Sequence, residues 1–210
     1  MKEMQEMQET ILKMKNSVKF AQSCLIPAYQ EIAYLTANTE ILFEDASENL
    51  QTLNKAIKKS AKKRGIVSRN TIRSSCACID GFSYILKCAL QRTLDRTEEG
   101  LFNNGQLKFI KSNFTNGSGA DNYKDSLKCF AKKYGVDVSG VFGTGEFDKL
   151  KEIFEIRNRL MHPKNGNDFE ITQEETILLT EAIVWFVDSQ HMVFKQVLDH
   201  IEKQVNEVCS

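Results

Sequence analysis

Residues 147–163 read FDKLKEIFEIRNRLMHP, and they decide the fold class of this 210-residue chain. Apolar side chains recur there at intervals of three and four positions, which is the period of an α-helix that buries one face. These side chains are Phe147, Leu150, Ile153, Phe154, Leu160 and Met161. Because the residue before a proline disfavours the α conformation, we expect the helix to stop at His162 and to present the imidazole at its end.

One charged residue, Arg157, falls on that apolar stripe. A half-buried guanidinium is costly unless it is paired, so Arg157 either has a carboxylate partner or lines a site. Asp80 is a comparable anomaly, because it borders the apolar face of a helix expected over residues 68–90. Gly81 beside it allows a close backbone approach. An Asp80–Arg157 pair would account for both charges; the alternative is that Asp80 is an ordinary surface aspartate.

Helical periodicity extends over most of the chain, and the presence of only two prolines favours long helices. Further helices are expected over residues 4–25, 32–63, 122–134 and 172–205, and residues 136–142 are expected to be a loop. We therefore predict an all-α fold, a helical bundle with a long N-terminal helical extension. Residues 1–64 would form the extension, packed on the bundle, and residues 65–210 the helical domain.

Two segments are apolar enough to suggest an intermolecular contact. The first is an a/d heptad seam formed by Met4, Met7, Ile11, Met14, Val18, Ala21 and Leu25. It either packs within the chain or contacts a second copy or another protein, and Pro27 is expected to kink or restart the helix behind it. The second runs from Ile177 to Val187 and is apolar nearly all round, which indicates central burial or contact with a second subunit.

The charges balance, with 28 Lys and Arg against 28 Asp and Glu. A dedicated non-specific nucleic-acid binder is usually basic, so any RNA must be held by a local patch. One basic cluster consists of Lys58, Lys59, Lys62, Lys63 and Arg64. It is either a solvated helix C-terminus, with Gly65 as its cap, or a patch that contacts phosphates.

Several classes of protein are disfavoured by the sequence. No apolar core follows the first residues, and the run from Ala182 to Val187 is too short to span a bilayer. The six cysteines form no C-x-x-C pair and are expected to be reduced, mostly buried thiols. The glycines at 140, 143 and 145 are not followed by the Lys-Ser/Thr of a phosphate loop, which disfavours a phosphotransferase. We expect a cytoplasmic protein with no cofactor, no metal and no membrane segment.

The run Arg157-Asn158-x-x-x-His162, at the end of a helix and before a proline, resembles the signature of the HEPN superfamily. The resemblance covers roughly residues 68–200. It implies a bundle of HEPN type and a metal-independent endoribonuclease that acts as a homodimer, with its active cleft between the protomers. It also implies a toxin or anti-phage defence effector, with an antitoxin or other regulatory protein as a partner. An acidic residue on an earlier helix near the motif, here Asp80, fits the same resemblance.

The three motif residues suit RNA cleavage by the ribose 2′-OH. His162 can act as general base or acid. Arg157 can hold a phosphate oxygen and stabilise developing charge, and Asn158 can position the nucleophile or brace the histidine. The expected products are a 2′,3′-cyclic phosphate, or its hydrolysed form, and a 5′-OH end. Because one histidine cannot easily be acid and base in one step, a second copy would supply the other.

Further cations are candidates for contacts with RNA: Arg159, Lys164, Arg69 and Arg73. Arg159 is equally well explained as a solvated charge, and the remaining histidines, His191 and His200, are expected to be structural or surface residues. Two other functions stay open. The chain could be a non-catalytic HEPN-like module that binds RNA, nucleotides or a protein. It could also be a helical scaffold whose N-terminal arm recruits another protein.

Overall fold

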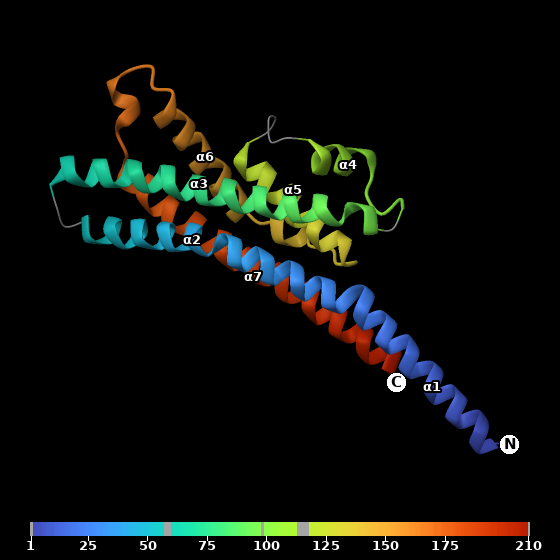
Figure 1. Cartoon of the computed structure of the whole chain (residues 1–210). Coiled ribbons are helices and arrows are strands. Elements are labelled where there is room, and N and C mark those ends of the chain that lie inside the picture. Colours follow the sequence, from blue (N-terminus) through green and yellow to red (C-terminus); the bar gives the residue numbers. More distant parts are fainter. Residues whose placement is uncertain (1, 57–59, 98, 113–117, 210) are drawn as a thin grey trace.

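The computed structural model describes residues 2–56, 60–97, 99–112 and 118–209, and within these ranges it contains helices and no strands. The α-helices are α1 (Lys2–Phe20), α2 (Ile26–Ala56), α3 (Ala61–Thr93), α4 (Asn104–Lys111), α5 (Gly119–Lys133), α6 (Glu146–Met161) and α7 (Gln173–Cys209). Short 3-10 segments lie at Leu94–Arg96, Ser139–Phe142 and Gly166–Phe169. The prediction of an all-α fold with a long N-terminal helical segment is confirmed (Figure 1).

The N-terminal segment is one long rod, because α1 continues into α2 through a π-helical stretch at Ala21–Leu25. Pro27 lies just after this stretch, where its missing N–H and its ring would disturb a regular α-helix. The wider π turn accommodates it, with the Ile26 N–H donating to the carbonyl of Ala21. The sequence left two outcomes at Pro27, a kink or a restart of the helix. The helix continues through Pro27, so the restart is wrong.

The predicted helix end at Lys63 was wrong. Helix α2 ends at Ala56, and α3 begins at Ala61, so Gly65 lies inside α3 rather than capping α2. Lys63 and Arg64 thus occupy the first turn of α3, where cations oppose the helix dipole instead of complementing it. Lys58 and Lys59 lie outside the described residues. The boundary expected between residues 64 and 65 consequently falls within a continuous helix.

The bundle is built around α3. Helix α2 runs antiparallel along one side of α3, and α5 and α6 pack against its other sides (Figure 1). Helix α7 crosses the bundle and then follows the rod, with its C-terminal part beside α1. A hydrogen bond of 3.3 Å from the Tyr29 hydroxyl to the Glu202 carboxylate joins rod and α7 in this region.

An aromatic cluster fills the space between α2, α3, α5 and α7. Phe82 of α3 is buried at its centre, with the rings of Tyr123 and Phe186 at centroid distances of 6.0 and 5.7 Å. Tyr123 is fully buried, and its hydroxyl lies 2.6 Å from that of Ser189 and donates to the Phe186 carbonyl. Its polar atom is therefore satisfied, as a buried tyrosine requires.

Exposed apolar side chains remain on the rod. Met7, Ile11, Met14 and Val18 of the predicted heptad seam all face solvent. Helix α1 also contacts α7, and Leu25, at the end of the seam, packs against the core. Packing within the chain does not cover Met7, Ile11, Met14 and Val18, so these side chains are available for contact with a second copy or another protein.

Helix α7 combines a buried and an exposed apolar face. Leu179, Ala182, Ile183 and Phe186 are buried in the core, whereas Ile177, Val184 and Val187 are exposed. By length and composition alone, the segment of α7 from Gln173 to Glu207 is apolar enough to cross a membrane. The short run from Ala182 to Val187, considered by itself in the sequence, did not predict this. The core helices of water-soluble proteins can be equally apolar, and 39 % of the most apolar stretch of this helix is buried in the bundle.

Among the side chains that the structure describes, five cysteines are free thiols, in agreement with the expectation from sequence: Cys24, Cys76, Cys78, Cys88 and Cys129. Three of them, Cys76, Cys78 and Cys129, are buried, and burial raises the pKa of each of these thiols to about 12. A thiol with such a pKa is protonated at neutral pH and a poor nucleophile. These cysteines therefore act as small core residues.

Candidate functional site

The C-terminal end of α6 carries the motif identified in the sequence. Its first turn is acidic, with Glu146 and Asp148, and its buried face includes Phe147, Leu150, Ile153, Phe154, Ile156 and Leu160. At His162 the backbone leaves the helical region, with φ −129° and ψ 59°, while its N–H still donates to the Asn158 carbonyl at 3.0 Å. The prediction that the helix ends at His162, in front of Pro163, is confirmed.

The predicted pair between Arg157 and Asp80 is present. The guanidinium Nη2 lies 4.0 Å from the Asp80 carboxylate, and Nη1 donates to the Asn158 side-chain oxygen at 3.0 Å. The two charged side chains are 34 % and 40 % exposed, so water screens this long ion pair. Arg157 is thus held by two partners but retains a solvent-facing side that can meet an anion.

These residues line a cavity of about 510 Å³ between α3, α5 and α6. Its walls consist of Asp80, Gly81, Tyr84, Ser118, Gly119, Asn122, Phe154, Arg157 and Asn158. At Gly119 a Cβ would collide with the ring of Phe154 and the carboxylate of Asp80. The glycine therefore allows α5 to begin directly against the charged pair, which a larger residue would prevent.

Burial raises the pKa of Asp80 above its ordinary value, and the nearby Arg157 guanidinium offsets part of this rise. A carboxyl with a raised pKa in the folded state favours folding while it is protonated, and this contribution is lost as the pH rises through the folded-state pKa. Ionised Asp80 is therefore a local cost to stability at neutral pH. Such costs are common where a charge is kept for binding or catalysis.

We expect the Asp80→Asn variant to gain stability relative to the wild type as the pH rises from the ordinary pKa of an aspartate, about 4, toward neutrality, because it avoids ionising a partly buried carboxyl. Urea unfolding of both proteins at several pH values would measure the difference. Asp199→Asn, at an exposed position on α7, serves as the control for removal of a surface carboxylate. A relative loss of stability with rising pH would mean that the ion pair with Arg157 outweighs desolvation.

His162 lies at the edge of this arrangement. Its side chain is exposed, and it is not among the residues that line the cavity. It follows Asn158 by four positions along the same chain segment, so it sits one turn beyond the cavity wall. Within one chain, the structure brings Arg157, Asn158 and Asp80 together and leaves the imidazole open to whatever approaches the end of α6.

Three of the four cations proposed as RNA contacts bind the protein itself. Arg73 donates to the Leu160 carbonyl at 3.1 Å, and Arg69 to the Phe169 carbonyl at 3.0 Å. Arg159 lies 2.9 Å from the Glu175 carboxylate and also donates to the Glu170 carbonyl. Arg69 joins α3 to the loop after α6, Arg73 joins α3 to the end of α6, and Arg159 joins α6 to the loop and to the start of α7. The sequence did not reveal these structural roles.

The loop that these arginines hold leads into α7. Thr172 and Glu175 form a capping box, with the Thr172 N–H donating to Glu175 and the Glu175 N–H donating to Thr172. Lys164, the fourth cation, is exposed on this loop. Its backbone N–H donates to Asp168, and this bond lowers the pKa of that carboxyl. The loop is therefore organised, and the Lys164 side chain extends from it into solvent.

Sequence reasoning missed Tyr84, Ser118 and Asn122 as cavity residues. Tyr84 follows Asp80 by four positions on α3, so helical spacing alone could have placed it on the same face. Asn122 sits in the first turns of α5, whose Ser118 N-cap accepts from the Asp121 N–H at 3.1 Å. The position of Asn122 in the cavity wall depends on how α5 packs against α3, and no local sequence pattern predicts that packing.

The described part of the chain contains no group of three His, Cys, Asp or Glu side chains placed to hold a metal ion. No family model matches the chain, and no curated protein or solved structure matches it at a significant level. The site must therefore be interpreted from its own geometry and from the motif.

Proposed function

We propose that this protein is a metal-independent endoribonuclease of HEPN type, cleaving RNA by attack of the ribose 2′-OH. The observation that supports it is the contact between Arg157 and Asn158 on the wall of a polar cavity, with His162 one turn further along. A guanidinium, an amide and an imidazole cover the needs of this reaction: charge stabilisation, positioning and proton transfer.

In this mechanism Arg157 binds a non-bridging phosphate oxygen and stabilises the charge that develops on it. Asp80 keeps the guanidinium oriented from the other side, as a positioning residue. Asn158 positions the nucleophilic 2′-oxygen, and the imidazole of His162 takes its proton. The 5′-oxygen leaves with a proton from a second acid, which gives a 2′,3′-cyclic phosphate and a 5′-OH end.

A homodimer would supply that second acid. Three apolar side chains are exposed in this part of the sequence: Met161 at the end of α6, Phe169 in the loop after it and Ile177 early in α7. A second copy that covers them would bring its own His162 to the cleft and exclude water from it. We further propose that the protein acts in the cytoplasm as a toxin or anti-phage defence effector under the control of an antitoxin, since uncontrolled RNA cleavage would harm the host.

The test is a cleavage assay on a mixed-sequence RNA in the presence of EDTA, with analysis of the product ends. We expect cyclic phosphate ends from the wild type and a loss of about 10²–10³-fold in rate for Arg157→Ala, the cost of removing a donor that stabilises the transition state. Arg157→Lys keeps the positive charge but not the planar guanidinium, which can bind a phosphate through two hydrogen bonds. Its rate should therefore lie between those of the wild type and Arg157→Ala. Cleavage that requires a divalent ion, or that Arg157→Ala leaves unchanged, would contradict the proposal.

One observation favours a second candidate, a non-catalytic HEPN-like module that binds RNA, nucleotides or a protein. The His162 imidazole lies outside the cavity that Arg157 lines, so a single chain could bind a phosphate there without cleaving it. This candidate predicts no cleavage by the purified wild type, together with nucleotide binding that weakens in Arg157→Ala. The same cleavage assay, followed by a binding titration, separates the two functions.

A further inference from the structure

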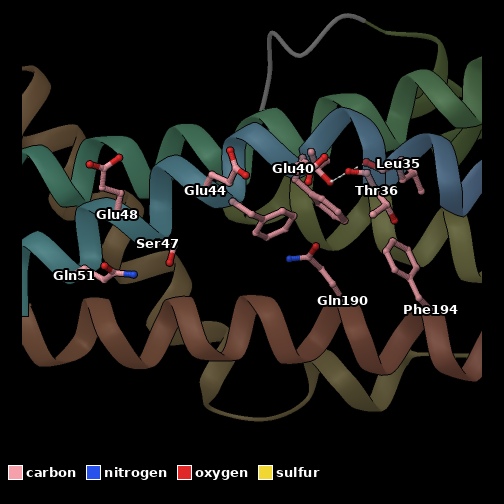
Figure 2. Close-up of a pocket in the computed structure, with 12 residues that line it drawn as sticks. Leu35, Thr36, Glu40, Glu44, Ser47, Glu48, Gln51, Gln190 and Phe194 are labelled. Carbon is pink, nitrogen blue, oxygen red and sulfur yellow. Dashed lines mark hydrogen bonds between the residues drawn. The ribbon is translucent and has the colours of Figure 1, made fainter.

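A second concave region lies between α2 and α7, away from the motif. It is a groove of about 650 Å³ whose floor includes Leu35, Phe43, Phe82 and Phe194. Figure 2 shows Glu40, Glu44 and Glu48 along α2, and Gln190 and Phe194 extending from α7 toward α2. None of its lining residues belongs to the cavity at Arg157.

The three glutamates are repeated at intervals of four along α2, so they share one face of the helix, about 6 Å apart. Like charges at this spacing repel each other. In the described part of the chain none of the three has a basic partner within ion-pair distance, and no Lys, Arg or His lines the groove. The wall is thus complementary to a cation.

An apolar cavity of about 440 Å³ adjoins this groove, because Phe43 and Ser47 line both. It extends between α2, α3 and α7, and its walls include Leu50, Ile79, Ile183 and Phe186. The only charged residue that lines it is Asp188, which adds a further negative charge at this end. The cavity can therefore hold an apolar body whose cationic end reaches the glutamates.

One wall of the apolar cavity carries an unsatisfied polar group. Ser75 of α3 is 1 % exposed, and its Oγ has no hydrogen-bond partner among the described residues. Buried hydroxyls in folded proteins are nearly always hydrogen-bonded, so an unpaired one in a cavity wall calls for an explanation. A bound molecule with a polar atom in its apolar part would pair with it.

We propose that the groove and the adjoining cavity together bind an organic amine with an apolar body. The ammonium group lies between Glu44 and Glu48, near the ring of Phe43, and combines ion pairing with cation–π attraction. The body fills the apolar cavity, and a hydroxyl or amide on it pairs with Ser75. This site is independent of the proposed nuclease function, since it shares no residue with that site.

Isothermal titration of the full chain tests this with matched probes of equal chain length: octylamine, 1-octanol, octanoate and 8-amino-1-octanol. We expect octylamine to bind about tenfold more tightly than 1-octanol, which corresponds to one ion pair, and octanoate not to bind. The Glu44→Gln/Glu48→Gln double variant should lose this preference. Glu152→Gln/Glu155→Gln, with both positions exposed on α6, is the control and should keep it.

Ser75 is tested by a comparison of two amines. In the wild type 8-amino-1-octanol should bind more tightly than octylamine, and in Ser75→Ala this advantage should disappear while octylamine binding persists. Equal binding of octylamine and 1-octanol, or a preference that survives in the glutamate double variant, would overturn the proposal. So would selective binding of an amphipathic Leu/Lys peptide with no binding of octylamine, which would identify the groove as a protein-docking surface.

Discussion

Replacement of His162 by alanine is expected to lower the rate of RNA cleavage by about 10²–10⁴-fold, the range for loss of a general acid or base. The exposed position of this side chain at the end of α6 makes the substitution mild for folding, so stability should change by less than about 0.5 kcal/mol. The measurement is single-turnover cleavage of an end-labelled RNA in EDTA. The His191→Ala variant, which removes an exposed imidazole from α7, is the matched control and should cleave at the wild-type rate.

The His162 variant can also show where the imidazole acts. If each active site takes Arg157 from one copy and His162 from the other, a dimer of one His162→Ala and one Arg157→Ala chain contains one intact site. Random pairing of the two co-expressed chains would then restore about a quarter of the wild-type activity, because half of the dimers are mixed and each has one of two sites intact. No restoration is the expected result if each cleft uses the His162 of both copies, as in the mechanism proposed above, or if Arg157 and His162 act within one chain. Unchanged activity of His162→Ala alone would exclude the histidine from catalysis.

The site was predictable where a local pattern conflicted with a chemical rule. Arg157 interrupts an apolar helical stripe and Asp80 borders another, and a half-buried charge needs a partner. The observed distance of 4.0 Å between their charged groups follows from that requirement. The end of α6 was predictable for a similar reason, since Pro163 restricts the backbone of the residue before it.

The start of α3 could not be found in this way. The Lys-rich run followed by Gly65 satisfies the local criteria for a helix C-terminus, yet Lys63 and Arg64 lie in the first turn of α3, where cations oppose the helix dipole. Only the packing of α2 along α3 places the break near residue 60. The roles of Arg69 and Arg73 were hidden for a different reason, because their acceptors are backbone carbonyls of the distant residues Phe169 and Leu160.

A buried polar network at the other end of the bundle was also absent from the sequence interpretation. Glu31 of α2 lies 2.7 Å from the Lys133 ammonium, and these side chains are only 6 % and 13 % exposed. Lys133 also donates to the Thr93 hydroxyl at 2.7 Å, and the Tyr134 hydroxyl donates to Glu31. The network joins α2, α3 and the end of α5. Burial and the adjacent Glu31 carboxylate raise the pKa of Tyr134, so its hydroxyl remains a donor.

We expect Glu31→Ala to destabilise the protein by about 3–5 kcal/mol, because it leaves the Lys133 ammonium buried without a counter-charge. Urea unfolding followed by circular dichroism measures this loss. Glu155→Ala, at an exposed position on α6, is the control and should stay within about 0.5 kcal/mol of the wild type. A loss below about 1 kcal/mol in Glu31→Ala would mean that water reaches the ammonium and replaces the carboxylate.

The double variant Glu31→Leu/Lys133→Met distinguishes the cost of an orphaned charge from the value of the pair. With both charges removed, no buried ion remains, and apolar side chains of similar size replace the desolvated groups. We therefore expect the double variant to recover most of the stability lost in Glu31→Ala, since buried ion pairs exchanged for apolar residues are often neutral or stabilising. A double variant as unstable as the single one would show instead that the bonds from Thr93 and Tyr134 need the carboxylate, and that the network itself holds α2 against α3 and α5.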